Sequence, residues 1–190
     1  MEKKLKLHMV MLGCTPAGRL TEQHDIFFGI GASLKDLIPE MKAFWPEAKG
    51  KIHIDAWREV SVADNFSIEI ITKESAENTN LDHLFFINLG GYKENEFEEY
   101  HYKMLTVATS LGLASKKSRK TTFYKHCGFK GAGVSHIDEK YGIDIDDIYK
   151  VTDILDSQLK EKYSIKITKS ETELHEDVLH IGYLKISGIK

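Results

Sequence analysis

Met9-Val-Met-Leu-Gly13 and, later in the chain, Phe85-Phe-Ile-Asn-Leu-Gly90 are the two stretches that decide the fold. Each is a short apolar run that stops at a glycine, which is typical of a buried β-strand followed by a turn. Leu12-Gly13 recurs as Leu89-Gly90, 77 residues further on. A recurrence of this kind predicts that one structural unit occurs twice.

Other matches extend the recurrence along the chain in the same order. The paired segments are Glu22–His24 with Glu99–His101, Ser33-Leu34 with Ser110-Leu111 and, after an insertion of six residues, His53–Asp55 with His136–Asp138. Four matches in one order are difficult to explain by chance. We therefore interpret the chain as two diverged copies of one unit, residues 1–78 and 79–190, packed into one body.

The first copy is expected to fold in the order ββαββ. Apolar and alternating patterns predict strands at Leu5–Leu12, Gln23–Ile30, Ile52–Val60 and Phe66–Thr72. Apolar residues from Leu34 to Trp45 recur at helical spacing, and Ser33 with Asp36 has the pattern of a capping box. Pro39 lies inside this helix and lacks a backbone donor, so it predicts a kink or a short 3₁₀ start.

Two strand pairs around one helix predict an α+β fold, with a mixed, β-grasp-like sheet covered by its helix on one face. The second copy is expected to repeat the ββα part, with a weaker helix from Ser110. It then diverges into a helix at Asp147–Tyr163 and strands at Ser164–Thr168 and Val178–Ser187.

Composition restricts the class of protein. Apolar residues make up 42% and charged residues 29% of the 190 residues, the balance of a globular protein with a sizeable core. The net charge of −3 gives the whole chain no basic footprint for nucleic acid. No run approaches the roughly 18 apolar residues of a membrane span. Lys6 and His8 interrupt the apolar N-terminus, so no signal peptide is predicted.

The two cysteines, Cys14 and Cys127, do not have the spacing of metal ligands. In a chain of this size they indicate free thiols in a reducing compartment. We therefore expect a cytoplasmic protein.

Several segments together resemble a known bacterial family, domain of unknown function 1543. They are Glu22–Asp25, Lys51–Trp57, Leu84–Tyr92, Gly131–Gly142 and Leu179–Lys185. The resemblance covers nearly the whole chain and implies a bacterial, non-secreted protein. It brings no activity, cofactor or catalytic residue with it.

A doubled set of histidines and carboxylates is the first candidate for a functional site. Because side chains on a strand alternate between faces, Glu22 shares a face with His24, and His53 shares one with Asp55 and Trp57. If the strands lie close, these side chains converge. The candidate ligand-binding residues are Glu22, His24, His53, Asp55 and Trp57 in the first copy, and Glu99, His101, His136 and Asp138 in the second.

This set is open to three interpretations. Two imidazoles and a carboxylate can hold zinc or iron with open coordination positions. A carboxylate that orients an imidazole can also form an acid–base pair. In the structural alternative, the strands are joined through the helix without pairing, and the side chains bond to backbone where the two copies meet.

A basic segment is the second candidate. No acidic residue occurs from His101 to Ile137, whereas seven lysines and arginines do. The segment includes Gly128-Phe-Lys130-Gly131, where glycines would let backbone N–H groups approach an anion and Lys130 would supply charge. The structural alternative is a solvated surface, which is what most charge runs are.

These observations favour a binding module for a small anionic ligand or a protein partner at the junction of the two copies. The alternatives are a metal-assisted or His/Asp acid–base hydrolase and a scaffold that forms a homodimer. The sequence identifies no cofactor, and it leaves open whether the chain is an enzyme.

Overall fold

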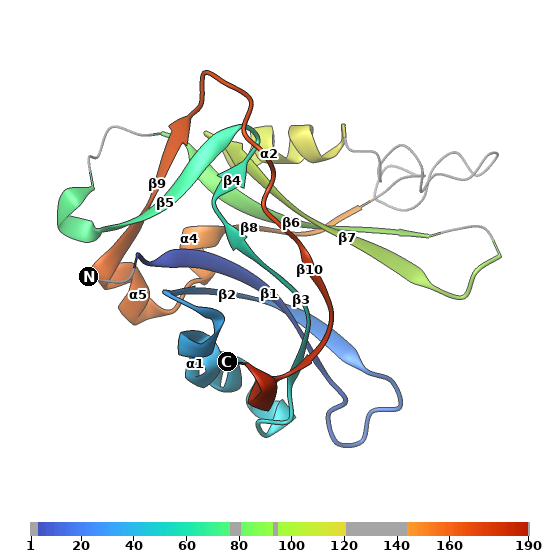
Figure 1. Cartoon of the computed structure of the whole chain (residues 1–190). Coiled ribbons are helices and arrows are strands. Elements are labelled where there is room, and N and C mark those ends of the chain that lie inside the picture. The colour runs from blue at the N-terminus through green and yellow to red at the C-terminus, as the bar shows by residue number, and fades with distance from the viewer. Residues whose placement is uncertain (1–3, 77–80, 93–94, 121–143, 190) are drawn as a thin grey trace. The chain divides into compact units, whose positions relative to one another are not determined.

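The computed structural model describes residues 4–76, 81–92, 95–120 and 144–189 (Figure 1). The chain divides into two compact units. The first unit comprises Met1–Glu77 together with Leu155–Lys190, and the second comprises Asn78–Ile154. No helix in the described ranges is long and apolar enough to cross a membrane. The fold is α+β, with more residues in strands than in helices.

The main sheet of the first unit has four antiparallel strands in the order β10-β3-β1-β2. Their bounds are Lys6–Cys14 for β1, Gln23–Gly31 for β2, His53–Val60 for β3 and His180–Lys185 for β10. The segment between β2 and β3 is helical, with η1 at Leu34–Leu37, α1 at Ile38–Phe44 and η2 at Pro46–Ala48.

This helical segment covers one face of the main sheet. Leu37 and Met41 pack with Val10, Leu12 and Ile54 in one buried cluster. The expected 3₁₀ start is confirmed, because η1 precedes α1 and Pro39 occupies the first turn of α1, where no backbone donor is needed. The expected capping box is not formed. Ser33 Oγ instead lies 2.8 Å from a carboxylate oxygen of Asp36.

A second, three-stranded sheet in the first unit has the order β4-β5-β9. The strands are Val62–Ala63, Phe66–Thr72 and Tyr163–Lys169. The remaining elements of the first unit are η3 at Lys73–Ser75, α5 at Ser157–Lys162 and η4 at Ile186–Gly188.

The second unit is a three-stranded antiparallel sheet in the order β7-β6-β8. Its strands are β6 at His83–Tyr92, β7 at Glu99–Ala108 and β8 at Asp144–Lys150. Among the described residues, α2 at Leu111–Ser118 follows β7 and α4 at Val151–Ile154 follows β8. Buried Ile87 and Leu89 pack against Ala114 of α2.

The two units have the same strand register. Gly13 of β1 pairs with His24, and Gly90 of β6 pairs with His101. The register of β1 with β3 shifts between Met11 and Leu12, and that of β6 with β8 shifts between Asn88 and Leu89. Both correspondences keep the offset of 77 residues that the sequence shows.

The pairings correct several expectations. Every strand pairing in the described residues is antiparallel, so the expected mixed sheets are not found there. Strand β5 pairs with β9 rather than joining β1, β2 and β3, so it does not complete a β-grasp sheet. The segment Asp147–Tyr163, expected to be one helix, contains the end of β8 and the helices α4 and α5.

The compact units also differ from the expected division into 1–78 and 79–190. Strand β9 pairs with β5 and β10 pairs with β3, so the C-terminal strands belong to the first unit. Local patterns identified the C-terminal strands, but the partner of a strand depends on contacts far along the chain.

Candidate functional site

Four side chains that the sequence singled out meet in the first unit. His53 Nε2 lies 3.0 Å from a carboxylate oxygen of Glu22 and 3.2 Å from Asp55 Oδ2. His24 Nε2 lies 3.2 Å from the same Asp55 oxygen and 3.6 Å from Glu22. We call Glu22, His24, His53 and Asp55 the polar cluster.

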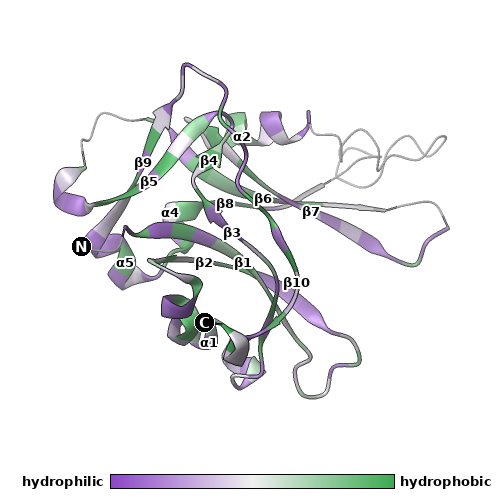
Figure 2. Cartoon of the chain, in the orientation of Figure 1, coloured by the Kyte–Doolittle hydropathy of each residue, from purple (hydrophilic) through white to green (hydrophobic). Residues whose placement is uncertain are grey.

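The strand order brings the two histidines together. Strands β2 and β3 do not pair with each other but lie on either side of β1, and Gly13 is the pairing partner of both His24 and His53. Residues directly opposite each other in an antiparallel sheet project from the same face. The end of β2 at the β1–β2 turn is hydrophilic, as Figure 2 shows.

Gly13 makes room for the polar cluster. A Cβ atom at this position would lie 2.4 Å from both Asp55 Oδ2 and His53 Nε2. The sequence analysis used Gly13 only as the end of a strand. Its position between two strands that each carry a histidine is apparent only from the sheet order.

A register shift between Met11 and Leu12 changes the predicted faces of β3. Ile54 pairs with Leu12 and Ala56 pairs with Met11, so Asp55 is the extra residue of a bulge. Beyond the bulge, Trp57 pairs with Val10 and packs against the buried cluster beneath the sheet. The expectation that Trp57 shares a face with His53 and Asp55 is therefore wrong, because the bulge reverses the alternation.

The polar cluster has an inner pair, His53 and Asp55, and a more exposed outer pair, Glu22 and His24. His53 is only 9% exposed, whereas the Glu22 and His24 side chains are 43% and 41% exposed. His53 Nε2 and Asp55 Oδ2 are buried and form no hydrogen bond. The angles of their close N–O contacts therefore do not meet hydrogen-bond geometry. Two carboxylates, those of Glu22 and Asp55, stand on this face of the sheet.

Strand β10 adds aromatic side chains that the sequence analysis did not select. The ring of Tyr183 lies against the imidazole of His53, with centroids 4.5 Å apart. On the same strand, His180 stacks on Trp57 with centroids 3.9 Å apart and planes 6° from parallel. Trp57 thus contacts the C-terminal strand as well as the core.

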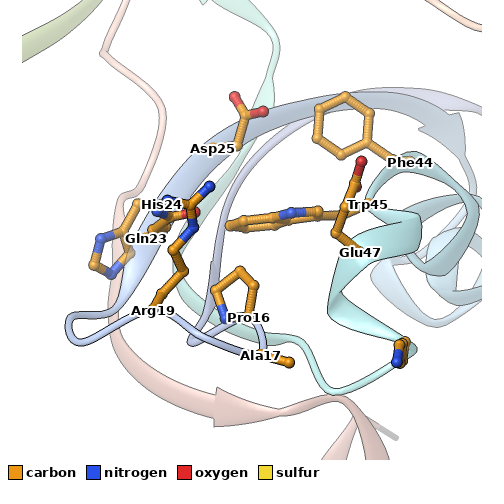
Figure 3. Close-up of a pocket in the computed structure, with 10 residues that line it drawn as sticks. Pro16, Ala17, Arg19, Gln23, His24, Asp25, Phe44, Trp45 and Glu47 are labelled. Atoms are coloured by element: carbon orange, nitrogen blue, oxygen red, sulfur yellow. The ribbon is translucent and has the colours of Figure 1, made fainter.

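A cavity of about 770 Å³ lies beside the polar cluster at the start of β2. It is lined by Pro16, Ala17, Arg19, Gln23, His24, Asp25, Phe44, Trp45, Glu47 and Lys49. Figure 3 shows the indole of Trp45 reaching toward Arg19, with His24 at the margin and turned away from Trp45. His24 therefore belongs to the polar cluster and also lines the cavity.

The candidate residues of the second unit are only partly described. His101 Nε2 lies 3.8 Å from a carboxylate oxygen of Glu99, as the recurrence predicts for a related pair. Lys130, His136 and Asp138 lie outside the described residues. Gly90 pairs with His101 and with Asp144, as Gly13 pairs with His24 and His53. Asp144 thus takes the register position of His53.

Comparisons with known proteins find a family and a solved structure to which this chain is similar. The family Domain of Unknown Function (DUF1543) matches residues 19–70, which include the whole polar cluster. The crystal structure of protein Il1583 from Idiomarina loihiensis is similar, with a TM-score of 0.63 and 21% identity over 96% of this chain and 98% of that chain. No curated protein matches. The structural likeness shows the fold alone, and the similarity to the DUF1543 family covers residues 19–70.

Proposed function

We propose that the first unit binds a divalent transition-metal ion of the zinc class at the polar cluster. The observation that carries the proposal is the spacing of the donor atoms, whose N–O distances are 3.0 to 3.6 Å. Donor atoms about 2.0–2.2 Å from a tetrahedral zinc ion lie about 3.3–3.6 Å from one another. The three contacts of 3.0 and 3.2 Å would therefore lengthen slightly around an ion. Imidazole and carboxylate are also ligand types that zinc takes.

The buried, unbonded atoms support the same proposal. An unsatisfied buried polar group costs about 1–3 kcal/mol, and the cluster contains two, His53 Nε2 and Asp55 Oδ2. A cation between them would satisfy both. Gly13 leaves the space that these atoms occupy, where any larger residue would intrude.

Binding requires a small rearrangement of the outer pair. Among the residues that the structure describes, no group of three or more histidine, cysteine, aspartate or glutamate side chains is already arranged to hold a metal ion. Glu22 and His24 are substantially exposed and can turn about their side-chain bonds at little cost. The inner pair, fixed by burial, would supply the preorganised part of the site.

The charge of the cluster favours a cation over the small anion expected from the sequence. Glu22 and Asp55 would repel an anion at close range, whereas a divalent cation offsets both charges. The part of the basic segment that suggested an anion, Gly128–Gly131 with Lys130, lies outside the described residues. The anionic ligand expected from the sequence stays a prediction.

Metal-assisted hydrolysis is the second candidate function. The cavity beside His24 would hold an organic substrate next to the cluster, and the exposed outer pair admits water. A bound metal ion supplies an activated water molecule in this class of reaction. Turnover of ester or phosphoester substrates that depends on both added metal and His53 would establish it.

We also infer that the two units arose by duplication. The shared register of β1 with β2 and of β6 with β7, at the offset seen in the sequence, supports this. The predicted homodimer stays a prediction.

Zinc binding by chelator-treated protein, measured by native mass spectrometry and titration calorimetry, tests the metal proposal. We expect the wild-type protein to bind Zn²⁺, and His53→Ala and Asp55→Asn to weaken this binding at least tenfold. His175→Ala, an exposed histidine away from the cluster, is the matched control. Unchanged affinity in His53→Ala and Asp55→Asn would rule out the site.

A further inference from the structure

We propose that Tyr183 is a positioning residue of this metal site and that Gly182 brings it there. The inference rests on the proposed metal binding and extends it to the C-terminal strand. Tyr183 lies about 130 residues from His53 in the chain, and it was not among the candidate site residues.

The pairing of β10 with β3 is irregular at the polar cluster. Ile181 pairs with Ala56 and Leu184 pairs with Ile54, so Gly182 and Tyr183 together stand opposite Asp55. Asp55 is also the bulge residue on the other side of β3. Strand β10 therefore follows the bulge and then resumes pairing with His53 through Lys185.

Gly182 makes this path possible. Its φ is +129°, a conformation that residues with a side chain rarely adopt. An added Cβ would meet no atom within 4 Å, so the requirement for glycine is conformational rather than steric. A substitution at Gly182 would thus redirect β10 without a clash.

The contact between Tyr183 and His53 determines how the imidazole is held. His53 is buried, and its Nε2 faces Glu22 and Asp55. The Tyr183 ring lies at 38° to the imidazole plane with centroids 4.5 Å apart. The direction of the Nε2 lone pair follows the ring orientation, which neighbours of a metal ligand normally fix.

The exposure of Tyr183 distinguishes a positioning role from ordinary packing in the core. Tyr183 is 64% exposed, so it contributes little to the buried core. Its removal should therefore change metal affinity and leave the stability of the metal-free protein almost unchanged. An exposed tyrosine without a role at the site would change neither property.

The test measures Zn²⁺ affinity and the Co²⁺ absorption spectrum in four variants of the full chain. Tyr183→Ala and Gly182→Ala should bind Zn²⁺ about tenfold more weakly, the lower end of the effect of losing a hydrogen-bonded outer-shell partner. Tyr183→Phe, which keeps the ring, should bind as the wild type does. Ile181→Ala, on the same strand and 81% exposed, is the matched control and should also be unchanged.

The outcomes distinguish this inference from the function on which it rests. If His53→Ala abolishes binding while Tyr183→Ala stays within twofold of the wild type, the metal site stands and the role of Tyr183 is excluded. If His53→Ala binds normally, the metal site itself is excluded. A shifted Co²⁺ spectrum in Tyr183→Ala, with the thermal midpoint of the metal-free protein unchanged, supports positioning.

Discussion

His53 Nε2 and Asp55 Oδ2 lie 3.2 Å apart on β3, and both are buried without a hydrogen bond. Such an arrangement is costly for a folded protein unless something else satisfies the two atoms. Gly13 lies beside them on β1, and a side chain there would collide with both. The three positions together define a small polar site built into one face of the sheet.

Gly13→Ala should disrupt the polar cluster. Its Cβ would lie 2.4 Å from Asp55 Oδ2 and His53 Nε2, so both side chains must move. We expect a loss of about 1–3 kcal/mol in the free energy of unfolding, typical of overpacking, together with weaker Zn²⁺ binding. Urea denaturation and calorimetry measure the two effects. Gly112→Ala, where an added Cβ meets open space in a helix, should be neutral or slightly stabilising.

Buried His8 should make stability depend on pH. Burial lowers the pKa of His8, and the positive charge of Lys6 lowers it further. The charges of Glu59 and Asp36 and the backbone of Lys6 oppose this shift without cancelling it. The unfolded chain then binds the proton more readily, so stability is full above the ordinary histidine pKa of 6.5 and falls as the pH drops through it.

His8→Leu should weaken this pH dependence. The polar ring of His8 is completely buried, so an apolar side chain in its place should also stabilise the protein by about 1 kcal/mol. Urea denaturation at pH 5.5 and 7.5 compares the variant with the wild type. An equal loss of stability in both proteins at the lower pH would contradict the prediction.

Asp177 should anchor the segment that precedes β10. Its carboxylate accepts hydrogen bonds from the backbone N–H groups of Ser61 and Val62, at 2.9 and 3.2 Å, and from the Ser61 hydroxyl. Asp177→Ala should lower the free energy of unfolding by about 1–3 kcal/mol. The adjacent exposed Glu176→Ala is the control. Equal denaturation midpoints for the two variants would show that the anchor does not contribute.

Cys14 should react slowly with thiol reagents in the native protein. It is almost completely buried, and burial raises the pKa of its thiol. Cys127→Ser leaves Cys14 as the single thiol, because the chain has two cysteines. We expect slow labelling by a disulfide reagent at pH 8 and rapid labelling in guanidinium chloride. Fast labelling of the native variant would show that β1 opens readily at this end.

The sequence by itself determined the strands β1, β2, β3, β6 and β7 and the 3₁₀ start before Pro39. It also determined that Glu22, His24, His53 and Asp55 are candidates for one site. These features depend on local periodicity, on proline geometry and on short motifs, which neighbouring residues encode.

Only the tertiary structure decided which strands pair and where the alternation breaks. It placed β1 between the two histidine strands, made Gly13 the space between them and gave Asp55 a bulge that turned Trp57 toward the core. It also brought Tyr183 to His53 through β10. Strand partners and bulges depend on contacts between residues far apart in the chain, and no local pattern carries that information.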